Sequence, residues 1–416
     1  MTADAGAVGT SEELDDTPPT PLDSDLHRRA SAYRALRADG PVVPFPGIDG
    51  VLAAVSYEAV DVGLRSVEHF GGSAGQDEIS DIDKNIAGMV EPRHGKVRRI
   101  MNSVVAFHKS QQIESYLQDL VARLVDGMLE EARVVGEVGV DVVPHLAVPI
   151  PPAAMARLLG FPEEDAQEYY RWVAEGGRRF QEAAATGASV AAADANPEQA
   201  EYIDQKIEER LARPREEWPE DALTRFLVTE VEGERLEPRN IRAQIMFMIG
   251  AGSDTTKNLI GSLLYRLGRD PDVYAALRDD PDLIDVAIEE ALRMDAPAQF
   301  MVRRCREPMA LAGTPVDEGQ RVFMCIGSAN HDEAKFEDPD RFRLDRATRE
   351  HLAFGSGPHV CPGAALARLE VRTLMREFTR RIVAFHLVEP DHYDALPTGM
   401  LQGQRSLRIV VDAEAG

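Results

Sequence analysis

The hydrophobic pattern of this chain is mostly that of helices. Apolar residues recur at helical spacing through Gln112–Arg179 and through the proline-free run Ile241–Leu267, where they cover a broad face. Shorter runs predict helices at Leu26–Ala38 and Pro197–Leu211. Pro41–Ser56 differs, because short apolar runs there alternate with Gly and Pro, which predicts a hairpin in a small sheet.

Other parts of the chain carry weaker signals. Gly319–Met324 is typical of a strand, and the Ala-rich residues 181–196 are ambiguous. Residues 1–24 are rich in Asp, Glu, Thr and Pro, a composition that predicts disorder. Residues 25–416 contain no obvious linker, so we expect one large domain there, although its length exceeds that of most single domains.

The composition narrows the class of protein. Of the 416 residues 44% are hydrophobic, ample for a core, and the formal net charge of -25 argues against nucleic acid or an anionic membrane as a partner. No stretch approaches the ~20 apolar residues of a membrane span, and the acidic start of the chain is unlike a signal peptide. Three cysteines without an evident pairing pattern suit a reducing compartment. We expect a cytoplasmic protein that binds neither membrane nor nucleic acid.

One cysteine lies in a stretch with a particular backbone preference. Cys361 follows Gly355 and Gly357, which permit a tight turn with positive φ. Pro362 comes next, at or near the first position of an apolar helical run, residues 364–369. A cysteine just ahead of a helix N-terminus is expected to have a lowered pKa, because orphan N–H groups and the helix dipole stabilise the thiolate.

A thiolate in such a bend can serve as a nucleophile, a zinc ligand or a haem ligand. Zinc is disfavoured, because Cys305 and Cys325 are distant in sequence and no Cys-x-x-Cys or His-x-x-x-His pair accompanies them. A covalently attached c-type haem is disfavoured as well, since Cys-x-x-Cys-His is absent. For a lone cysteine, a buried structural thiol in an ordinary turn remains the plainer alternative.

The spacing Phe354-x-x-Gly357-x-His359-x-Cys361-x-Gly363 resembles the haem-binding loop of the cytochrome P450 family. The resemblance covers nearly all of the chain after its acidic start and implies that family's fold, mainly α with a small β-rich lobe. It implies haem b as the cofactor and Cys361 as the axial thiolate ligand of its iron. It further implies that Phe354 packs against the thiolate and that His359 reaches a haem propionate, with Gly363 completing the cofactor-binding loop.

The middle of the long predicted helix is a poor helix-forming sequence. Each glycine there weakens a helix by ~1 kcal/mol, and Ser and Thr hydroxyls compete for carbonyls, so we expect a kink or a widened turn. The run from Ala251 to Thr256 is similar to the family's oxygen-activation motif. By that resemblance Thr255 hydrogen-bonds dioxygen, Asp254 feeds protons from solvent, and Ala251 lies against the haem. Alone, this segment reads equally well as a glycine-tolerant packing site.

Two further places suggest contacts to the haem propionates. His94 and Arg98 are four residues apart, so a helix puts both on one face, which suits either an anionic ligand or a solvated surface. They resemble the family's His-x-x-x-Arg helix, which implies that they hold a propionate. The resemblance assigns the same role to Arg303, with Arg304 as the alternative, because Pro308 stands where the family usually has aspartate.

Glu290 and Arg293 are three apart on another predicted helix, where they form either a surface ion pair or part of a buried network. They resemble the family's Glu-x-x-Arg pair. The resemblance closes this network with Arg341, in a Pro-x-Arg-Phe segment, and implies a structural role in holding the cysteine loop.

We therefore expect a monomeric haem-thiolate monooxygenase that oxidises, most often hydroxylates, a mainly hydrophobic small molecule with O2. Electrons are expected from a ferredoxin and its reductase, because the chain shows no flavin or iron–sulfur signature. A positive docking patch is expected at Lys96, Arg99 and Lys109. The resemblance places these residues at the substrate: Met246, Ile249, Gly250, Ala298, Gln299, Phe300 and Leu401. A peroxide-driven haem oxidase and a non-catalytic haem-binding protein stay open as alternatives, and the Asp254–Thr255 relay weighs against both.

Overall fold

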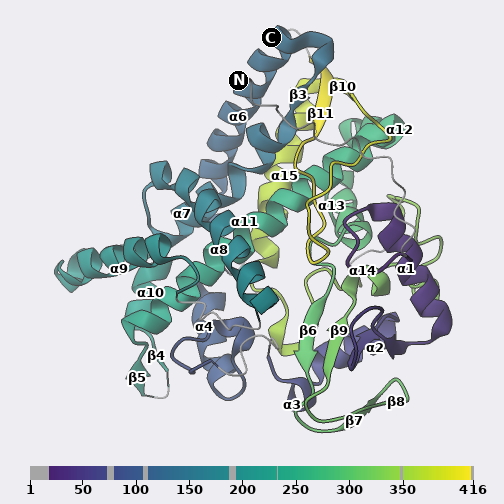
Figure 1. The fold of residues 1–416 in the computed structure, drawn as a ribbon. Coiled ribbons are helices and arrows are strands. Elements are labelled where there is room, and N and C mark those ends of the chain that lie inside the picture. Colours follow the sequence, from purple (N-terminus) through teal and green to yellow (C-terminus); the bar gives the residue numbers. More distant parts are fainter. Residues whose placement is uncertain are drawn as a thin grey trace, which may run out of the picture.

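The computed structural model describes residues 18–72, 79–105, 111–186, 194–231, 233–346 and 350–413. Residues 1–17 of the predicted disordered tail lie outside this part, as do residues 187–193 of the ambiguous segment. Helices dominate and gather around α11 (Pro238–Arg269), which crosses the middle of the molecule (Figure 1). The helices around it are α4 (Arg93–Val105), α6 (Glu114–Val135), α7 (Ile150–Leu159), α8 (Ala166–Thr186), α9 (Pro197–Leu211), α10 (Ala222–Val228), α12 (Pro271–Asp279), α13 (Leu283–Met294) and α15 (Ala364–Arg381). No helix in these residue ranges is both long and apolar enough to cross a membrane.

A small β-rich lobe lies beside the helices (Figure 1). Its four-stranded sheet has the order β1-β2-β9-β6 and consists of β1 (Val42–Pro44), β2 (Val51–Ala54), β9 (Arg321–Met324) and β6 (Met301–Arg304). β2 and β9 run parallel, with Val51 opposite Arg321, and the other two pairs are antiparallel. The predicted hairpin and strand are thereby confirmed. The lobe also contains α1 (Leu26–Asp39), α2 (Tyr57–Arg65), α3 (Val67–Phe70), α14 (Ile326–Ala329) and the hairpin of β7 (Met309–Leu311) and β8 (Thr314–Val316).

A second sheet joins segments that are distant in sequence. It has the order β10-β11-β3 and contains β10 (Ile382–Leu387), β11 (Arg408–Ala413) and β3 (Val140–Asp141). β3 interrupts the stretch that we predicted to be helical, because Asp141 pairs with Arg408 near the other end of the chain. A short apolar run of this kind suits helix and strand alike until its partner is known. A separate hairpin contains β4 (Glu230–Val231) and β5 (Glu234–Arg235).

Two apolar cores meet along α11. Its first part, Ile241–Ile249, packs in one core with α4, α7, α8, α9 and α10. Its last part, Leu259–Leu267, packs in the other with α6, α12, α13 and α15. Residues 250–258, all of them in the described part of the chain, contribute to neither core. The centre of the protein is therefore where its longest helix lacks apolar packing.

Candidate active site

The Cys361 loop forms a tight turn held against α2. Gly355 and Gly357 have φ angles of +73° and +71°, which side chains rarely adopt. A Cβ on Gly357 would lie 2.9 Å from the Cα of Arg65, so this glycine also permits the close approach of the loop to α2. The Cys361 N–H donates to the Phe354 carbonyl at 2.8 Å and closes the turn. The two glycines of the motif thus fix where the thiol lies.

The electrostatic surroundings of Cys361 differ from our expectation. Burial is the largest influence and raises the pKa of the thiol. The N–H groups of Gly363 and Ala364 act in the opposite direction, as do the nearby guanidinium groups of Arg98 and Arg368. The predicted lowering of the pKa is therefore wrong for the protein as it stands here. α15 begins at Ala364, capped by Gly363, so these N–H groups do come from a helix N-terminus.

Phe354 packs against an arginine that belongs to a largely buried ion network. The guanidinium carbon of Arg368 lies 4.5 Å from the centre of the Phe354 ring. Arg368 donates to both carboxylate oxygens of Glu289, at 2.5 and 2.7 Å. His351 contacts the same carboxylate, with 3.2 Å between its Nε2 and Oε2. Phe354 is therefore supported by Arg368, which Glu289 in turn holds in place.

Two histidines from distant segments meet near the loop. His94 on α4 and His359 have ring centroids 4.0 Å apart. The Nδ1 of His94 lies 3.0 Å from a Glu91 oxygen, whereas its buried Nε2 has no hydrogen-bond partner. Burial, followed by the neighbouring His94, Arg303 and Arg98, together lower the pKa of His359 to about 3. The predicted propionate ligands thus come together, although they lie far apart in sequence.

Arg303 points into the same region with a buried side chain. The residue is only 6% exposed, and burial alone lowers its pKa to about 10. Arg98 donates to Asn102 at 2.9 Å, and burial lowers its pKa as well. Arg304 is exposed on the other face of β6, so burial favours Arg303 of the two arginines on this strand. A buried guanidinium without a carboxylate beside it calls for an anionic ligand.

The middle of α11 is open where the motif predicts the oxygen site. Ala251 is exposed although it lies at the centre of a 32-residue helix, and a Cβ on Gly250 would meet nothing within 4 Å. The helix runs from Pro238 to Arg269 without interruption through this stretch. Thr255 Oγ1 donates to the Ala251 carbonyl at 2.7 Å, the normal way for a helix to accommodate such a hydroxyl. An Asp254 oxygen lies 3.4 Å from Lys257 Nζ.

The residues predicted at the substrate divide into two groups. Gly250, Ala298 and Leu401 are partly accessible, and Ala298 and Leu401 pair across two loops. Met246 is only 6% exposed. Ile249 has no exposed surface and belongs to the first core, and Gln299 and Phe300 are buried in the β-rich lobe.

Two of these buried side chains are engaged within the β-rich lobe. The Gln299 amide donates to the Ala296 carbonyl at 2.7 Å, and the Phe300 ring lies 4.8 Å from Phe323. Phe300 immediately precedes the strand β6, so its ring is taken into the core of the sheet.

The buried ion network around Glu290 confirms part of the prediction and corrects the rest. Glu290 and Arg293 have no exposed side-chain surface and form a double hydrogen bond of 2.8 Å. The third member of the network is Arg346, whose Nε lies 3.3 Å from Glu290. The side chain of Arg341 is exposed, and only its carbonyl joins the network, accepting from Arg293 at 3.4 Å. Arg341 is therefore the wrong arginine, because the chain turns after it and brings Arg346 inward.

These features fit a haem. The protein has one cysteine on a tight loop and an open centre on its longest helix, and the buried guanidinium of Arg303 has no carboxylate partner, which suits a propionate. The unpartnered Nε2 of His94 is a donor or acceptor that the protein itself leaves unsatisfied. The residues that would hold the cofactor are Cys361, Phe354, Gly363, Ala251, His94, Arg98, Arg303 and His359. In the described ranges, no three His, Cys, Asp or Glu side chains gather as a conventional metal site.

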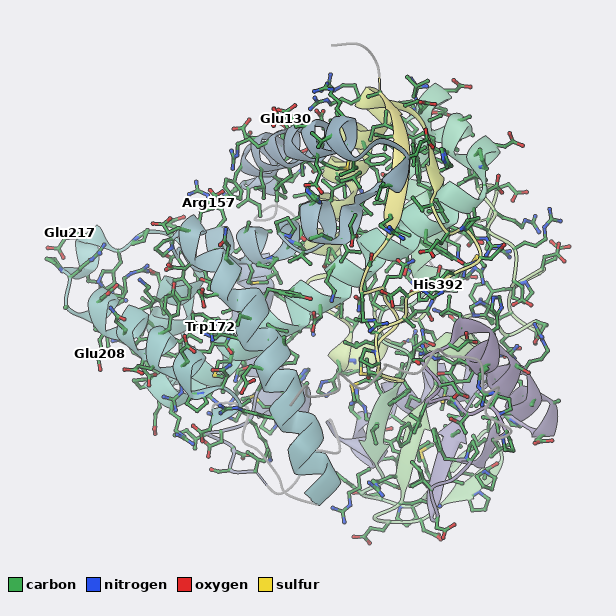
Figure 2. All side chains as sticks on the ribbon, turned by 45° about the horizontal axis from the view of Figure 1, so that its top comes forward. Glu130, Arg157, Trp172, Glu208, Glu217 and His392 are labelled. Carbon is green, nitrogen blue, oxygen red and sulfur yellow. The ribbon has the colours of Figure 1, made fainter. Side chains whose placement is uncertain are left out.

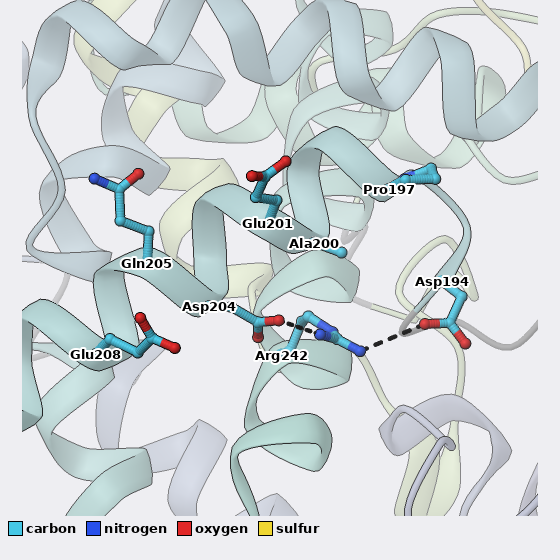
Figure 3. A pocket seen from close by; sticks show the side chains of 8 residues that line it. All are labelled: Asp194, Pro197, Ala200, Glu201, Asp204, Gln205, Glu208 and Arg242. Carbon is cyan, nitrogen blue, oxygen red and sulfur yellow. Dashed lines mark hydrogen bonds and ion pairs between the residues drawn. The ribbon is translucent and has the colours of Figure 1, made fainter.

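A hollow on the surface is distinct from this site. It measures ≈ 610 Å³ and lies between α9 and α11 (Figure 3). Among the described residues that line it, Arg242 is the cation and bonds to Asp194 and Asp204, while the remaining charged groups are carboxylates. With its charges paired in this way, the hollow has no feature that suits haem.

Sequence reasoning missed the supports of the cysteine loop. Glu289 directly precedes the Glu-x-x-Arg pair, and Arg368 lies seven positions after the cysteine. Adjacent helix positions face in different directions, so Glu289 and Glu290 serve separate networks. A buried turn of α15 with one arginine among apolar residues is the signal that would have pointed to Arg368.

Comparisons with known proteins agree with this arrangement. The family model described as cytochrome P450 matches residues 189–382. Cytochrome P450 107B1 of Saccharopolyspora erythraea is 33% identical over 72% of this chain and 70% of its own length. The cytochrome P450 monooxygenase PikC of Streptomyces venezuelae is 32% identical over 91% and 89%. A solved structure of a mutant of P450 EryK with erythromycin B superposes with a TM-score of 0.83 at 25% identity, covering 96% of this chain and 99% of that one. The chain therefore belongs to the cytochrome P450 family and is a haem-dependent monooxygenase with that family's fold.

Proposed function

We propose that this protein oxidises, most often by hydroxylation, a mainly hydrophobic small organic molecule, with two electrons from a ferredoxin and its reductase. The observation that carries the proposal is the open centre of α11, where Ala251 is exposed beside Thr255 in a helix otherwise packed on both sides. Thiolate-ligated haem, when bound, supplies the activation of dioxygen. Ala298 and Leu401, which the resemblance places at the substrate, are partly accessible and apolar, which suits a hydrophobic substrate.

The protein's own part in the chemistry is proton supply. The Thr255 hydroxyl donates its hydrogen bond to the Ala251 carbonyl. Its oxygen therefore remains an acceptor that can hold a water or receive a proton. Asp254 is held by Lys257, which is almost fully buried and lies 5.3 Å over the Tyr170 ring. We assign Thr255 the role of positioning the proton donor and Asp254 the role of recharging it from outside.

Electron delivery requires a docking surface near the cysteine loop. Arg99 on α4 is exposed, and Lys96 one turn before it is half-buried. Lys109, the third member of the predicted patch, lies outside the described residues. Relatives bearing the names of monooxygenases and a structure with bound erythromycin B support small organic substrates as the class. We also propose that the protein is monomeric and cytoplasmic.

Two measurements test this function. The reduced, CO-bound protein should show the red-shifted Soret band of thiolate-ligated haem, and the Cys361→Ala protein should lack it. A histidine-type band in the unaltered protein would contradict the role of Cys361. Compounds that shift the haem spin state are then tested with NADH and ferredoxin components, with peroxide alone, or with neither. Turnover with peroxide only would point to the peroxide-driven alternative, and turnover in no arm with any spin-shifting compound would point to a non-catalytic haem protein.

A further inference from the structure

Along one face of α11, after the proposed oxygen site, polar side chains of the helix and of a neighbouring segment lack hydrogen-bond partners. Asn258 and Gln404 are 1% and 2% exposed, yet neither the nitrogen nor the oxygen of either amide has a hydrogen-bond partner. The hydroxyl groups of Ser262, which is fully buried, and of Tyr393 also lack one. Such groups are rare in folded proteins, and four side chains with six unpaired atoms in one place need an explanation.

These four side chains come together because the segment between β10 and β11 runs alongside α11 (Figure 1). A Cβ on Gly403 would lie 2.2 Å from the Asn258 oxygen, and a Cβ on Gly261 would lie 3.0 Å from the Gln404 oxygen. Burial raises the pKa of Tyr393 and the Ser262 hydroxyl acts in the opposite direction, so these two side chains lie close together, although their hydroxyl groups make no hydrogen bond of normal geometry. We call Asn258, Ser262, Tyr393 and Gln404 the polar seam.

The chemistry of the polar seam suits water. All four side chains are neutral, and together they offer both donors and acceptors, so neither a cation nor an anion is matched by them. A buried water makes about three hydrogen bonds to such groups, so six unpaired atoms correspond to about two water molecules.

The position of the polar seam connects the proposed proton relay with the protein surface. Asn258 lies three residues after Thr255 and four after Asp254, so it is their neighbour on the helix. Ser262 follows one turn later. At the other end Tyr393 is partly accessible, and His392 beside it is exposed at the molecular surface (Figure 2).

The segment that carries Gln404 is fixed independently of the unpaired groups. Gln402 donates to Asp295 at 2.5 Å, and Arg266 of α11 makes two bonds of 2.7 and 2.8 Å to the same carboxylate. Asp295 is only 2% exposed. Because this anchor holds the 402–404 turn against α11, the unpaired amides are not free to swing out and find solvent.

We propose that ordered water in the polar seam conducts protons from the surface near Tyr393 to the oxygen of Thr255. Each water accepts one proton from the outer side and donates one inward, so no oxidant or reductant is required. The inference rests on the proposed role of Thr255 and adds to it a supply route along α11 that does not use Asp254. The members of the seam are positioning residues, since they act on Thr255 through water.

The first test is structural and needs no activity. In an atomic-resolution crystal structure of the haem-loaded protein, we expect ordered waters within hydrogen-bond distance of Asn258, Ser262 and Gln404. Direct pairing of these side chains with one another, or a dry space between them, would overturn the proposal. The Gln404→Met protein should lose at least one of these waters while keeping the same backbone.

The second test measures how electrons are used. In Ser262→Ala and Gln404→Met, product formed per NADH should fall roughly two- to tenfold, part of the about 10²–10⁴-fold that general acid catalysis supplies. The solvent deuterium isotope effect on oxygen consumption should rise. Thr379→Ser, a buried hydroxyl on α15 bonded to Met375, is the matched control and should change neither.

Thr255→Ala, measured alongside, separates the two proposals. If it uncouples oxygen use from product while both seam variants behave like the control, the polar seam is not a proton route and the role of Thr255 stands. If Thr255→Ala itself leaves coupling unchanged, the proposed function of Thr255 is wrong and the route has no destination.

Discussion

The guanidinium of Arg368 lies over the Phe354 ring, 4.5 Å from its centre, while both of its donating ends bind Glu289. α15 thus supports the loop that carries Cys361, through a side chain whose ion pair is made with Glu289. The loop carries Cys361, and its rigidity depends on the ion pair between Arg368 and Glu289.

This relationship predicts the effect of Arg368→Met. The loss of a charged hydrogen bond and of the ring contact is expected to destabilise the loop by about 1–3 kcal/mol. The CO-bound protein should then convert faster from the thiolate-type Soret band to the form that lacks thiolate ligation. Arg380→Met, a change at an exposed position near the end of the same helix, is the control. An unchanged conversion rate in Arg368→Met would contradict the support role.

Glu289 predicts a specific loss of stability in acid. Its burial tends to raise the pKa of the carboxyl, but hydrogen bonds from Arg368 and His351 outweigh this and lower the pKa to about 2. An unfolded glutamate has a pKa of roughly 4.3, so folding is favoured by this group above that pH. The contribution should disappear as the pH falls from roughly 4.3 towards 2, where the folded state also takes up the proton.

The measurement is the free energy of unfolding in denaturant across this pH range. Glu289→Gln should be less stable than the unaltered protein at neutral pH and should show a flatter acid limb. Glu130→Gln, at an exposed position on α6 (Figure 2), should follow the unaltered protein. Equal acid limbs in all three proteins would show that Glu289 does not titrate as its contacts require.

The corrected ion network predicts different effects for two nearby arginines. Arg346→Met removes a partner from the fully buried Glu290 and should lower the free energy of unfolding by about 1–3 kcal/mol. Arg341→Met changes an exposed side chain whose carbonyl is retained, so its effect should lie within about 0.5 kcal/mol. Thermal or denaturant unfolding of the two variants checks this, and the reverse order would restore Arg341 to the network.

The buried Arg303 predicts effects of opposite sign in the two states of the protein. Without haem its guanidinium is buried without a carboxylate, so Arg303→Leu should leave the apoprotein as stable or more stable. With haem the same change removes a propionate contact, and haem should dissociate faster. Transfer of haem to an apoprotein acceptor and unfolding of the apoprotein measure the two effects. Arg304→Leu, on the exposed side of β6, should alter neither.

The sequence predicted the elements whose pattern is long and local. α11 shows this most clearly, because Pro238 opens it and its apolar face continues for many turns. The order of motifs then pointed to Cys361, His94 and Arg303. In the structure, His94 and Arg303 lie near His359. The sequence did not show which residues next to a motif have their side chains in the protein interior.

The errors share that cause. Arg341 and Arg346 both follow Glu290 by some fifty residues, and only the path of the chain between them decides which one reaches the carboxylate. Ile249 and Gly250 are adjacent on α11, yet one is in the core and the other at the opening. The thiol pKa of Cys361 also depends on burial, which no local pattern reports.

Because α11 contributes one half to each apolar core, neither core can melt without uncovering a flank of the same helix. A helix stripped on one side over several turns cannot be retained in water on its intrinsic propensity. The two halves of the protein are therefore expected to unfold together, because both depend on the same helix. The interruption at residues 250–258 gives the site its open space without dividing the molecule into independently folding parts.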